Sequence, residues 1–296
     1  MPRFLYIVSL ERSGSTPLSY NLGLQPGFVA LGEIDRTLAL LTRPGGFDGR
    51  VCSCGAAINK CPVWSPIAAA TDTLTPLGLA DRYRLIDRLL EPVLGEAAVI
   101  VDGSKPLDTL RAITPVLNDR LSVVHLVKDV RSYLESTLGR MASMDQDRLW
   151  SEAIARQPLR ARLMRVLPDT LVYLWRWARQ NRAMRDWLRT SDLAWLRIGY
   201  DDLCEDPEAW FARLAAISHA GGSAGQHHIL LGSFGYLDSG GGKRLATDRR
   251  WQSSSRRLRL SFAHALARSL NAELARAEEQ TARPAHDASP AGSMTT

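Results

Sequence analysis

The stretch that most constrains the fold is residues 4–18, where an apolar run breaks into a short polar turn followed by a proline. The apolar run from Phe4 to Leu10 suits a strand that is buried on both faces. Gly14 permits a tight turn, and Pro17 suits the first turn of a helix. A strand, a small-residue turn and a helix N-terminus together direct backbone N–H groups at an anion. The stretch therefore indicates a phosphate-type binding loop; the alternative is an ordinary strand–turn–helix connection.

The composition is that of a globular chain with an excess of positive charge. Of its 296 residues, 45% are apolar and 23% are charged, which is enough to form a large core. The net charge of +6 suits an anionic ligand but is too small to imply nucleic acid as a partner. Arginine dominates the basic residues, and its planar guanidinium suits the recognition of oxyanions.

The start of the chain shows no targeting segment. A strand begins almost at Met1, with neither a basic region nor a small-residue cleavage site before it. No stretch approaches the ~20 apolar residues of a membrane span. We therefore expect a cytoplasmic protein without a membrane span, either a monomer or a homo-oligomer.

Strand-like and helix-like segments alternate after the opening loop. Strands are predicted over 98–102, 121–127 and 193–198. Helices are predicted over 79–94, 107–117 and 145–190, the last broken near Pro168. This alternation predicts an α/β fold with a central parallel sheet and helices on both faces. In such sheets, ligands bind at the carboxyl ends of the strands.

The chain is expected to form one domain over residues 1–280. Within it, the Cys-containing segment 43–66 is predicted to be a loop excursion, and the Gly-rich segment 220–250 a mobile loop. A final helix is expected from Leu258 to about Glu278. The polar tail, 281–296, is predicted to be disordered.

Polar side chains gather where four of the strands end. These clusters are residues 12–16, Glu33, residues 104–105 and residues 128–136. Residues 12–18, Arg-Ser-Gly-Ser-Thr-Pro-Leu, resemble the 5′-phosphosulfate loop of the sulfotransferases that use 3′-phosphoadenylyl sulfate, especially the bacterial and carbohydrate-acting members. Residues 123–131, with Ser136 beyond them, resemble the 3′-phosphate motif of that family.

Two further matches lie between and after these motifs. Gly32-Glu33 resembles the acidic position that supplies the base in the carbohydrate branch, and Tyr200-Asp201-Asp202-Leu203 with Asp206-Pro207 resembles a later landmark. The resemblance covers about residues 3–275. It implies a P-loop nucleotide-hydrolase-like fold, with 3′-phosphoadenylyl sulfate as the sulfuryl donor and no required metal.

The resemblance also implies roles for individual residues. Arg12 would hold the phosphosulfate and stabilise the negative charge that grows on the leaving phosphate oxygen. Lys128 and Ser136 would bind the 3′-phosphate, although Lys128 stands where the family more often has an arginine. The residues that would donate amides and hydroxyls to the phosphosulfate are Ser13, Gly14, Ser15 and Thr16.

Glu33 and Lys105 are the candidates for the chemistry at the acceptor. Glu33 would act as general base on a hydroxyl of a carbohydrate, a glycolipid or a small molecule. Lys105 would contact the sulfuryl group or the acceptor. Each residue also has an ordinary interpretation. Glu33 would then be a helix N-terminal acid that interacts with the macrodipole, and Lys105 a surface lysine before a proline.

Two other function classes stay open. A Mg²⁺-dependent P-loop nucleotide kinase or phosphotransferase is disfavoured because the opening loop lacks the Gly-Lys-[Ser/Thr] of such enzymes, although Asp102 at a strand end is a candidate metal ligand. The second open class is a non-catalytic nucleotide-binding protein of the same fold. It remains open because residues 231–235 depart from the family's late nucleotide-binding motif, for which Lys243, Arg244 or Arg249 would have to substitute.

Three cysteines, Cys52, Cys54 and Cys61, gather in the segment 43–66, in a pattern that recurs in bacterial relatives. Zinc with a fourth ligand, Cys204 or a histidine, is one interpretation. The spacing lacks the usual Cys-x₂-Cys pair, which favours a packing cluster or a disulfide instead.

Overall fold

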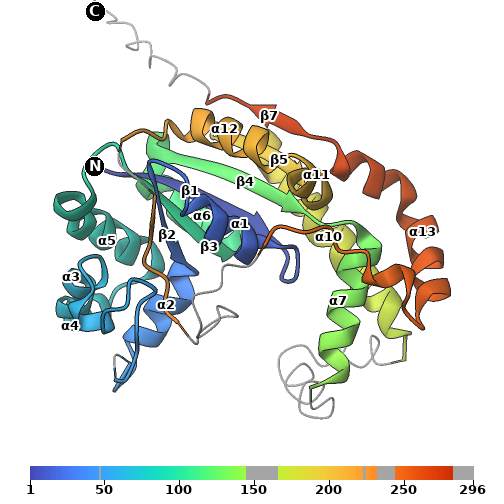
Figure 1. The fold of residues 1–296 in the computed structure, drawn as a ribbon, viewed down its shortest axis with the longest axis horizontal. Coiled ribbons are helices and arrows are strands. Elements are labelled where there is room, and N and C mark those ends of the chain that lie inside the picture. The colour runs from blue at the N-terminus through green and yellow to red at the C-terminus, as the bar shows by residue number, and fades with distance from the viewer. Residues whose placement is uncertain (47, 145–165, 223–224, 232–243, 283–296) are drawn as a thin grey trace, which may run out of the picture.

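Seven strands form one sheet in the computed structural model, which describes residues 1–46, 48–144, 166–222, 225–231 and 244–282. The strands are β1 (Arg3–Ser9), β2 (Phe28–Gly32), β3 (Val99–Lys105), β4 (Leu121–Val127), β5 (Ala194–Gly199), β6 (Gln226–His227) and β7 (Glu278–Gln280). Their order across the sheet is β6-β2-β3-β1-β4-β5-β7 (Figure 1). Strand β7 runs antiparallel to β5, and the other neighbours are parallel.

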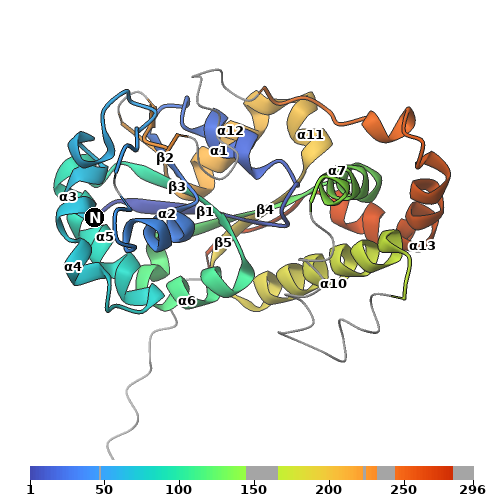
Figure 2. The same ribbon diagram turned by 90° about the horizontal axis from the view of Figure 1, so that it is seen from below.

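Helices cover both faces of the sheet (Figure 2). One face carries α2 (Ile34–Leu41), α3 (Trp64–Ala69), α4 (Thr71–Leu74), α5 (Leu79–Leu94), α6 (Leu107–Leu117) and part of α10 (Asp169–Thr190). The other carries α1 (Ser15–Leu22), α11 (Tyr200–Glu205) and α12 (Pro207–Ser218). A third apolar cluster joins α10 to α7 (Val130–Ala142) and α13 (Arg257–Ala275).

Strand β1 is the centre of this arrangement because it lies between β3 and β4. Its successive side chains point to opposite faces, so Tyr6 and Val8 enter one core and Leu5 and Ile7 enter the other. Both faces are covered, which explains why this strand is apolar at nearly every position. The predicted α/β fold, with a central and mainly parallel sheet and helices on both faces, is confirmed.

The segments 43–66 and 220–250 are more regular than predicted. Cys52 and Trp64 are fully buried in the core, and α3 begins at Trp64. Residues 226–227 form β6 and pair with β2, so the prediction of a mobile loop is wrong at this point. Burial of apolar side chains from both segments holds the backbone against the edge of the sheet.

The end of the chain also differs from the prediction. Helix α13 ends at Ala275, and residues 278–280 form the edge strand β7. Glu278 Oε2 lies 2.6 Å from Arg197 Nη2, and its Oε1 lies 2.7 Å from Arg189 Nε. These ion pairs, together with hydrogen bonds to β5, hold the segment extended where the sequence predicted helix.

Other predictions lie partly outside the described residues. The second part of the predicted 145–190 helix is present as α10, which follows Pro168. Its first part, residues 145–165, and most of the predicted tail, residues 283–296, are not described. Among the helices that the structure describes, none combines the length and the apolar character needed to cross a membrane.

His125 lies in β4 and is fully buried, as expected of a core residue. Its Nε2 lies 3.2 Å from Asn181 Oδ1, while the Asn181 amide donates to the carbonyl of Trp177. Burial lowers the pKa of His125 to about 3. The native state therefore holds a neutral imidazole, whereas the unfolded chain binds a proton below about pH 6.5.

This difference predicts a loss of stability in mild acid. As pH falls from about 6.5 toward 3, only the unfolded state binds the proton, so the free energy of unfolding falls. Between about pH 7.5 and 5, the wild-type protein should lose about 2 kcal/mol more than His125→Gln does, as measured by urea unfolding. Equal losses in the two proteins would mean that His125 is charged in the native state.

Candidate active site

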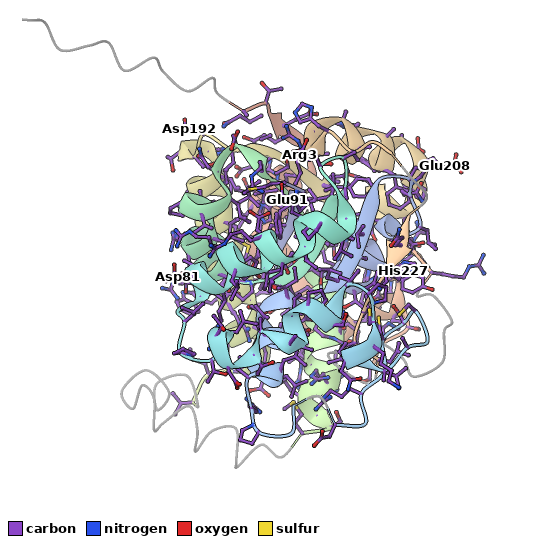
Figure 3. The ribbon with its side chains drawn as sticks, turned by 90° about the vertical axis from the view of Figure 1, so that its left-hand side faces the viewer. Arg3, Asp81, Glu91, Asp192, Glu208 and His227 are labelled. Atoms are coloured by element: carbon purple, nitrogen blue, oxygen red, sulfur yellow. The ribbon has the colours of Figure 1, made fainter. Side chains whose placement is uncertain are left out.

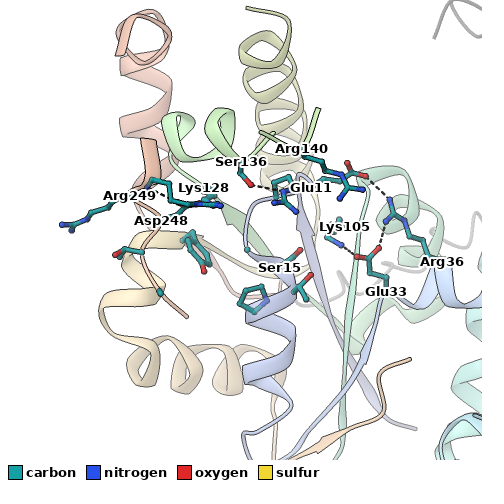
Figure 4. A pocket seen from close by; sticks show the side chains of 18 residues that line it. Glu11, Ser15, Glu33, Arg36, Lys105, Lys128, Ser136, Arg140, Asp248 and Arg249 are labelled. Atoms are coloured by element: carbon teal, nitrogen blue, oxygen red, sulfur yellow. Dashed lines mark hydrogen bonds and ion pairs between the residues drawn. The ribbon is translucent and has the colours of Figure 1, made fainter. Parts of the chain in front are cut away.

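A cavity of about 780 Å³ lies at the carboxyl ends of the parallel strands. A side chain at or just beyond the end of each of β1 to β5 lines it: Arg12, Glu33, Lys105, Lys128 and Tyr200. Figure 4 shows Lys128 toward one end, Glu33 and Lys105 toward the other, and Ser15 between them. Among the described lining residues, seven are Arg or Lys and three are Asp or Glu. This excess of positive charge suits a polyanionic ligand.

Most of the residues singled out in the sequence meet here, although they come from distant parts of the chain. The cavity is lined by Arg12, Gly14, Ser15, Thr16, Glu33, Lys105, Lys128 and Ser136. Ser13 is the exception: it is buried and is not among the lining residues. The juxtaposition follows from the sheet order, which places the ends of β1 to β5 along one edge.

Arg12 links the opening loop to α7. Its Nε donates a hydrogen bond to Ser136 Oγ over 2.9 Å. Burial lowers the pKa of Arg12, and the nearby charges of Arg140 and Arg250 lower it further. Cations that repel one another in a cavity gain free energy when an anion binds between them. Arg12 and Ser136, predicted to hold different phosphates of one ligand, are therefore already neighbours.

The N-terminus of α1 also faces this cavity. Gly14 precedes the helix in a left-handed conformation, with φ of 93°. Ser15 and Thr16 form the first turn, where the backbone N–H groups have no carbonyl partner within the helix. The ring of Tyr200, from the start of α11, packs against Gly14 so closely that a Cβ there would overlap it. These contacts set the path of the binding loop.

Lys128 is buried at the opposite side of the cavity from Glu33 and forms an ion pair. Its Nζ lies 2.6 Å from Asp248 Oδ2 and 5.4 Å from the centre of the Tyr200 ring. Burial lowers the pKa of Lys128, and the Asp248 charge opposes this effect. Burial alone would raise the pKa of Asp248, but hydrogen bonds from Arg250 and Lys128 hold it well below its usual range. Asp248 is therefore an anion held within a cationic site.

Glu33 and Lys105 form a second ion pair at the other end. Lys105 Nζ donates to Glu33 Oε1, and both side chains are buried. The interpretation of Lys105 as a surface lysine is therefore wrong. Arg36, one helical turn beyond Glu33, lies 3.0 Å from its Oε2 and also 3.0 Å from Glu11. A carboxylate, an ammonium and a guanidinium thus meet at one point of the cavity wall.

Arg12 and Lys105 share an unusual backbone conformation. Their φ angles are 69° and 85°, in the left-handed region that residues other than glycine seldom adopt. Such a conformation costs on the order of 1 kcal/mol or more and persists only where the surroundings impose it. Strain of this kind is concentrated at functional sites, which supports a functional role for both side chains.

Asp102 holds the residue next to Glu33 and does not line the cavity. Its Oδ1 accepts hydrogen bonds from the backbone N–H groups of Ile34, over 3.3 Å, and Ser104, over 2.9 Å. Tyr83 Oη donates to its Oδ2 over 2.6 Å. Burial raises the pKa of Asp102 to about 7. Its oxygens therefore fix the first turn of α2, and with it the position of Glu33.

Several lining residues were missed by the sequence analysis, namely Glu11, Arg36, Arg140, Asp248 and Arg250. Only Arg36 could have been found, because it lies three residues beyond Glu33 on a predicted helix. Asp248 and Arg250 lie in the segment expected to be a mobile loop. Of the candidates to replace the late nucleotide motif, Arg249 lines the cavity and Arg244 does not, while Lys243 lies outside the described residues.

The cysteines form a separate group. Cys52, Cys54 and Cys61 converge with His228, and none of the four lines the cavity. Cys204, the other suggested fourth ligand, lies in α11 outside this group. All four cysteines are free thiols, so the structure contains no disulfide at this point.

Comparison with known proteins shows a resemblance in structure. No family model and no curated protein matches the chain. Among solved structures, the sulfotransferase domain of the Synechococcus PCC 7002 olefin synthase aligns with a TM-score of 0.47 and 20% sequence identity, over 75% of each chain.

The contact between Gly14 and Tyr200 predicts the effect of a methyl group at this position. Gly14→Ala should lower the free energy of unfolding by about 2 kcal/mol, because alanine is strained at a positive φ and its Cβ overlaps the ring. Urea unfolding measures the change. Gly139→Ala is the matched control: Gly139 lies in α7 with open space around its Cα, so alanine should stabilise by about 0.5–1 kcal/mol. Equal effects at the two sites would contradict the described packing.

Proposed function

We propose that the protein transfers a sulfuryl group from 3′-phosphoadenylyl sulfate to a hydroxyl of a carbohydrate, a glycolipid or a small molecule. The observation that carries this proposal is a basic cavity lined by Arg12, Lys128 and Ser136 on one side and by a carboxylate, Glu33, at the other end. A group-transfer enzyme needs this pairing: one part holds the charged donor, and another takes a proton from the attacking oxygen.

The donor would lie along the binding loop. Its 5′-phosphosulfate would accept hydrogen bonds from the backbone N–H groups at the start of α1 and from the guanidinium of Arg12. The 3′-phosphate would lie at Lys128 and Ser136, where it competes with Asp248 for the lysine. The Arg12–Ser136 hydrogen bond supports this arrangement, because it brings the two phosphate subsites next to each other.

The acceptor would enter at the Glu33 end. Its hydroxyl oxygen attacks sulfur in line with the leaving phosphate oxygen, and Glu33 takes the proton. Lys105 lies against Glu33 and would stabilise charge on the sulfuryl oxygens, while Arg12 would stabilise the charge that develops on the leaving phosphate. Arg36 and Glu11, at the same end, offer polar contacts that suit a hydroxyl-rich acceptor.

The donor assignment predicts a specific ligand response. Adenosine 3′,5′-bisphosphate, at about 100 times its Kd, should raise the Tm by about 5 °C, and adenosine 5′-phosphate should raise it less. Lys128→Met should remove the difference between the two nucleotides. Lys60→Met is the matched control, since Lys60 is an exposed lysine away from the cavity. Stabilisation by Mg-ATP but not by the bisphosphate would support the kinase alternative instead.

The base assignment predicts a change in rate without a change in donor binding. Glu33→Gln should lower kcat by at least about 100-fold while the Kd of the bisphosphate stays nearly constant. Transfer of radiolabelled sulfate from the donor to pools of glycans, glycolipids and small alcohols measures the rate. Asp108→Asn, which alters an exposed carboxylate outside the cavity, should keep full activity. A Glu33→Gln variant that loses donor binding as well would show that Glu33 only supports the site. If the wild-type protein binds the bisphosphate but modifies no pool, the non-catalytic alternative gains support.

A further inference from the structure

Three sulfur atoms and one imidazole nitrogen converge beside the edge strand β6. The ligand atoms of Cys52, Cys54, Cys61 and His228 all lie within 4.8 Å of one another. Cys52, Cys61 and His228 are buried, whereas Cys54 is exposed. His227, the neighbour of His228, marks this flank of the molecule in Figure 3. The four residues come from two segments that are far apart in the chain.

The three buried ligand atoms, of Cys52, Cys61 and His228, lie at separations close to the edges of a metal tetrahedron. Sγ of Cys61 lies 3.5 Å from Sγ of Cys52 and 3.2 Å from Nδ1 of His228, and Cys52 Sγ lies 3.8 Å from the same nitrogen. Zinc bonds of about 2.3 Å to sulfur and about 2.1 Å to nitrogen place the ligand atoms of a tetrahedral site about 3.5–3.8 Å apart. A disulfide needs sulfur atoms about 2 Å apart. The arrangement therefore fits a shared cation better than a covalent bridge.

The imidazole is oriented for this purpose. Its Nε2 lies 3.2 Å from Gln226 Oε1, which can only accept a hydrogen bond. The proton is therefore held on Nε2, and Nδ1 is left with a lone pair directed at the two buried sulfurs. A histidine that donates its second ring N–H to an oxygen is the usual arrangement of a metal ligand.

The two segments are also joined by further hydrogen bonds around the four side chains. Ser53 and Ile229 exchange two hydrogen bonds, of 2.8 and 2.9 Å, and Trp64 Nε1 donates to the carbonyl of His228 over 2.5 Å. Gly55 turns the cysteine segment with φ of 88°. These contacts hold the cysteines against His228, so that the ligand atoms are positioned before a metal binds.

We propose that Cys52, Cys54, Cys61 and His228 bind one zinc ion with a structural role. Three thiolates and a neutral imidazole are a common donor set of structural zinc sites. Four protein ligands close the coordination sphere and leave no position for water or substrate, which distinguishes the site from a catalytic one. Binding would release the thiol protons.

The position of the site indicates what the metal would stabilise. His228 directly follows β6, and β6 pairs with β2, the strand that Glu33 directly follows. The zinc ion would thus hold the cysteine segment and β6 against the edge of the sheet on which the cavity is built. This role does not depend on the reaction that the cavity performs.

Elemental analysis of untagged protein, purified without chelator, is the first test. The expected result is about one zinc ion per chain. Removal of the metal by a strong chelator should lower the Tm by several degrees, and added zinc should restore it. Cobalt(II) in place of zinc should give thiolate charge-transfer bands in the near ultraviolet and the intense visible bands of a tetrahedral ion.

Variants then assign the ligands. Cys61→Ser should reduce the zinc content to less than about a tenth, while Cys204→Ser, which alters a cysteine outside the cluster, should retain all of it. Cys61 is buried, so its variant risks misfolding. Cys54 is exposed, and Cys54→Ser is therefore the safer variant. It should reduce the cobalt charge-transfer intensity by about one third, because two of three thiolates remain.

Several results would overturn the proposal. The proposal is overturned if wild-type protein contains no zinc and binds none when zinc is added. It is also overturned if mass spectrometry finds a Cys52–Cys61 disulfide. Zinc that stays bound at full occupancy in Cys61→Ser would show that the metal lies elsewhere. A Tm that is unchanged on removal of the metal would exclude a structural role.

Discussion

The parallel pairing of β1 between β3 and β4 is the constraint on which the rest of the structure depends. Parallel strands in one sheet all end at the same edge, so the residues that follow them must meet there whatever their distance in the chain. Burial of β1 on both faces, in two separate cores, fixes this register. Arg12, Glu33 and Lys128 line one cavity for this reason.

The positive charge concentrated at the carboxyl ends of the strands must be compensated. Two carboxylates do this at opposite ends of the cavity: Asp248 pairs with Lys128 and Arg250, and Glu33 pairs with Lys105 and Arg36. The compensation is incomplete, because cations outnumber carboxylates among the described lining residues. The excess of positive charge favours an anionic ligand, and these four ion pairs hold the long side chains in defined positions until a ligand binds.

Beside β2, the sheet is extended sideways by segments that lack long regular structure. The cysteine segment and β6 contribute buried side chains, with Cys52 and Cys61 against His228 and Trp64 against its carbonyl. Each segment alone offers too little apolar surface to hold its conformation. Contacts between the cysteine segment and β6, made by the sulfur atoms and the imidazole, hold a conformation that the short strand β6 cannot hold alone.

The sequence by itself determined the α/β fold, the bounds of β4 and α6, and most residues of the candidate site. Strands buried on both faces and turn-forming residues at their ends are local patterns, and these persist whatever the chain does elsewhere. Only the tertiary structure decided that Asp102 supports α2, that His228 joins the cysteines and that Asp248 pairs with Lys128. Each of these contacts connects residues that are dozens of positions apart or more. No local pattern encodes such a contact, because it forms only when the packing of the sheet and helices brings the two segments together.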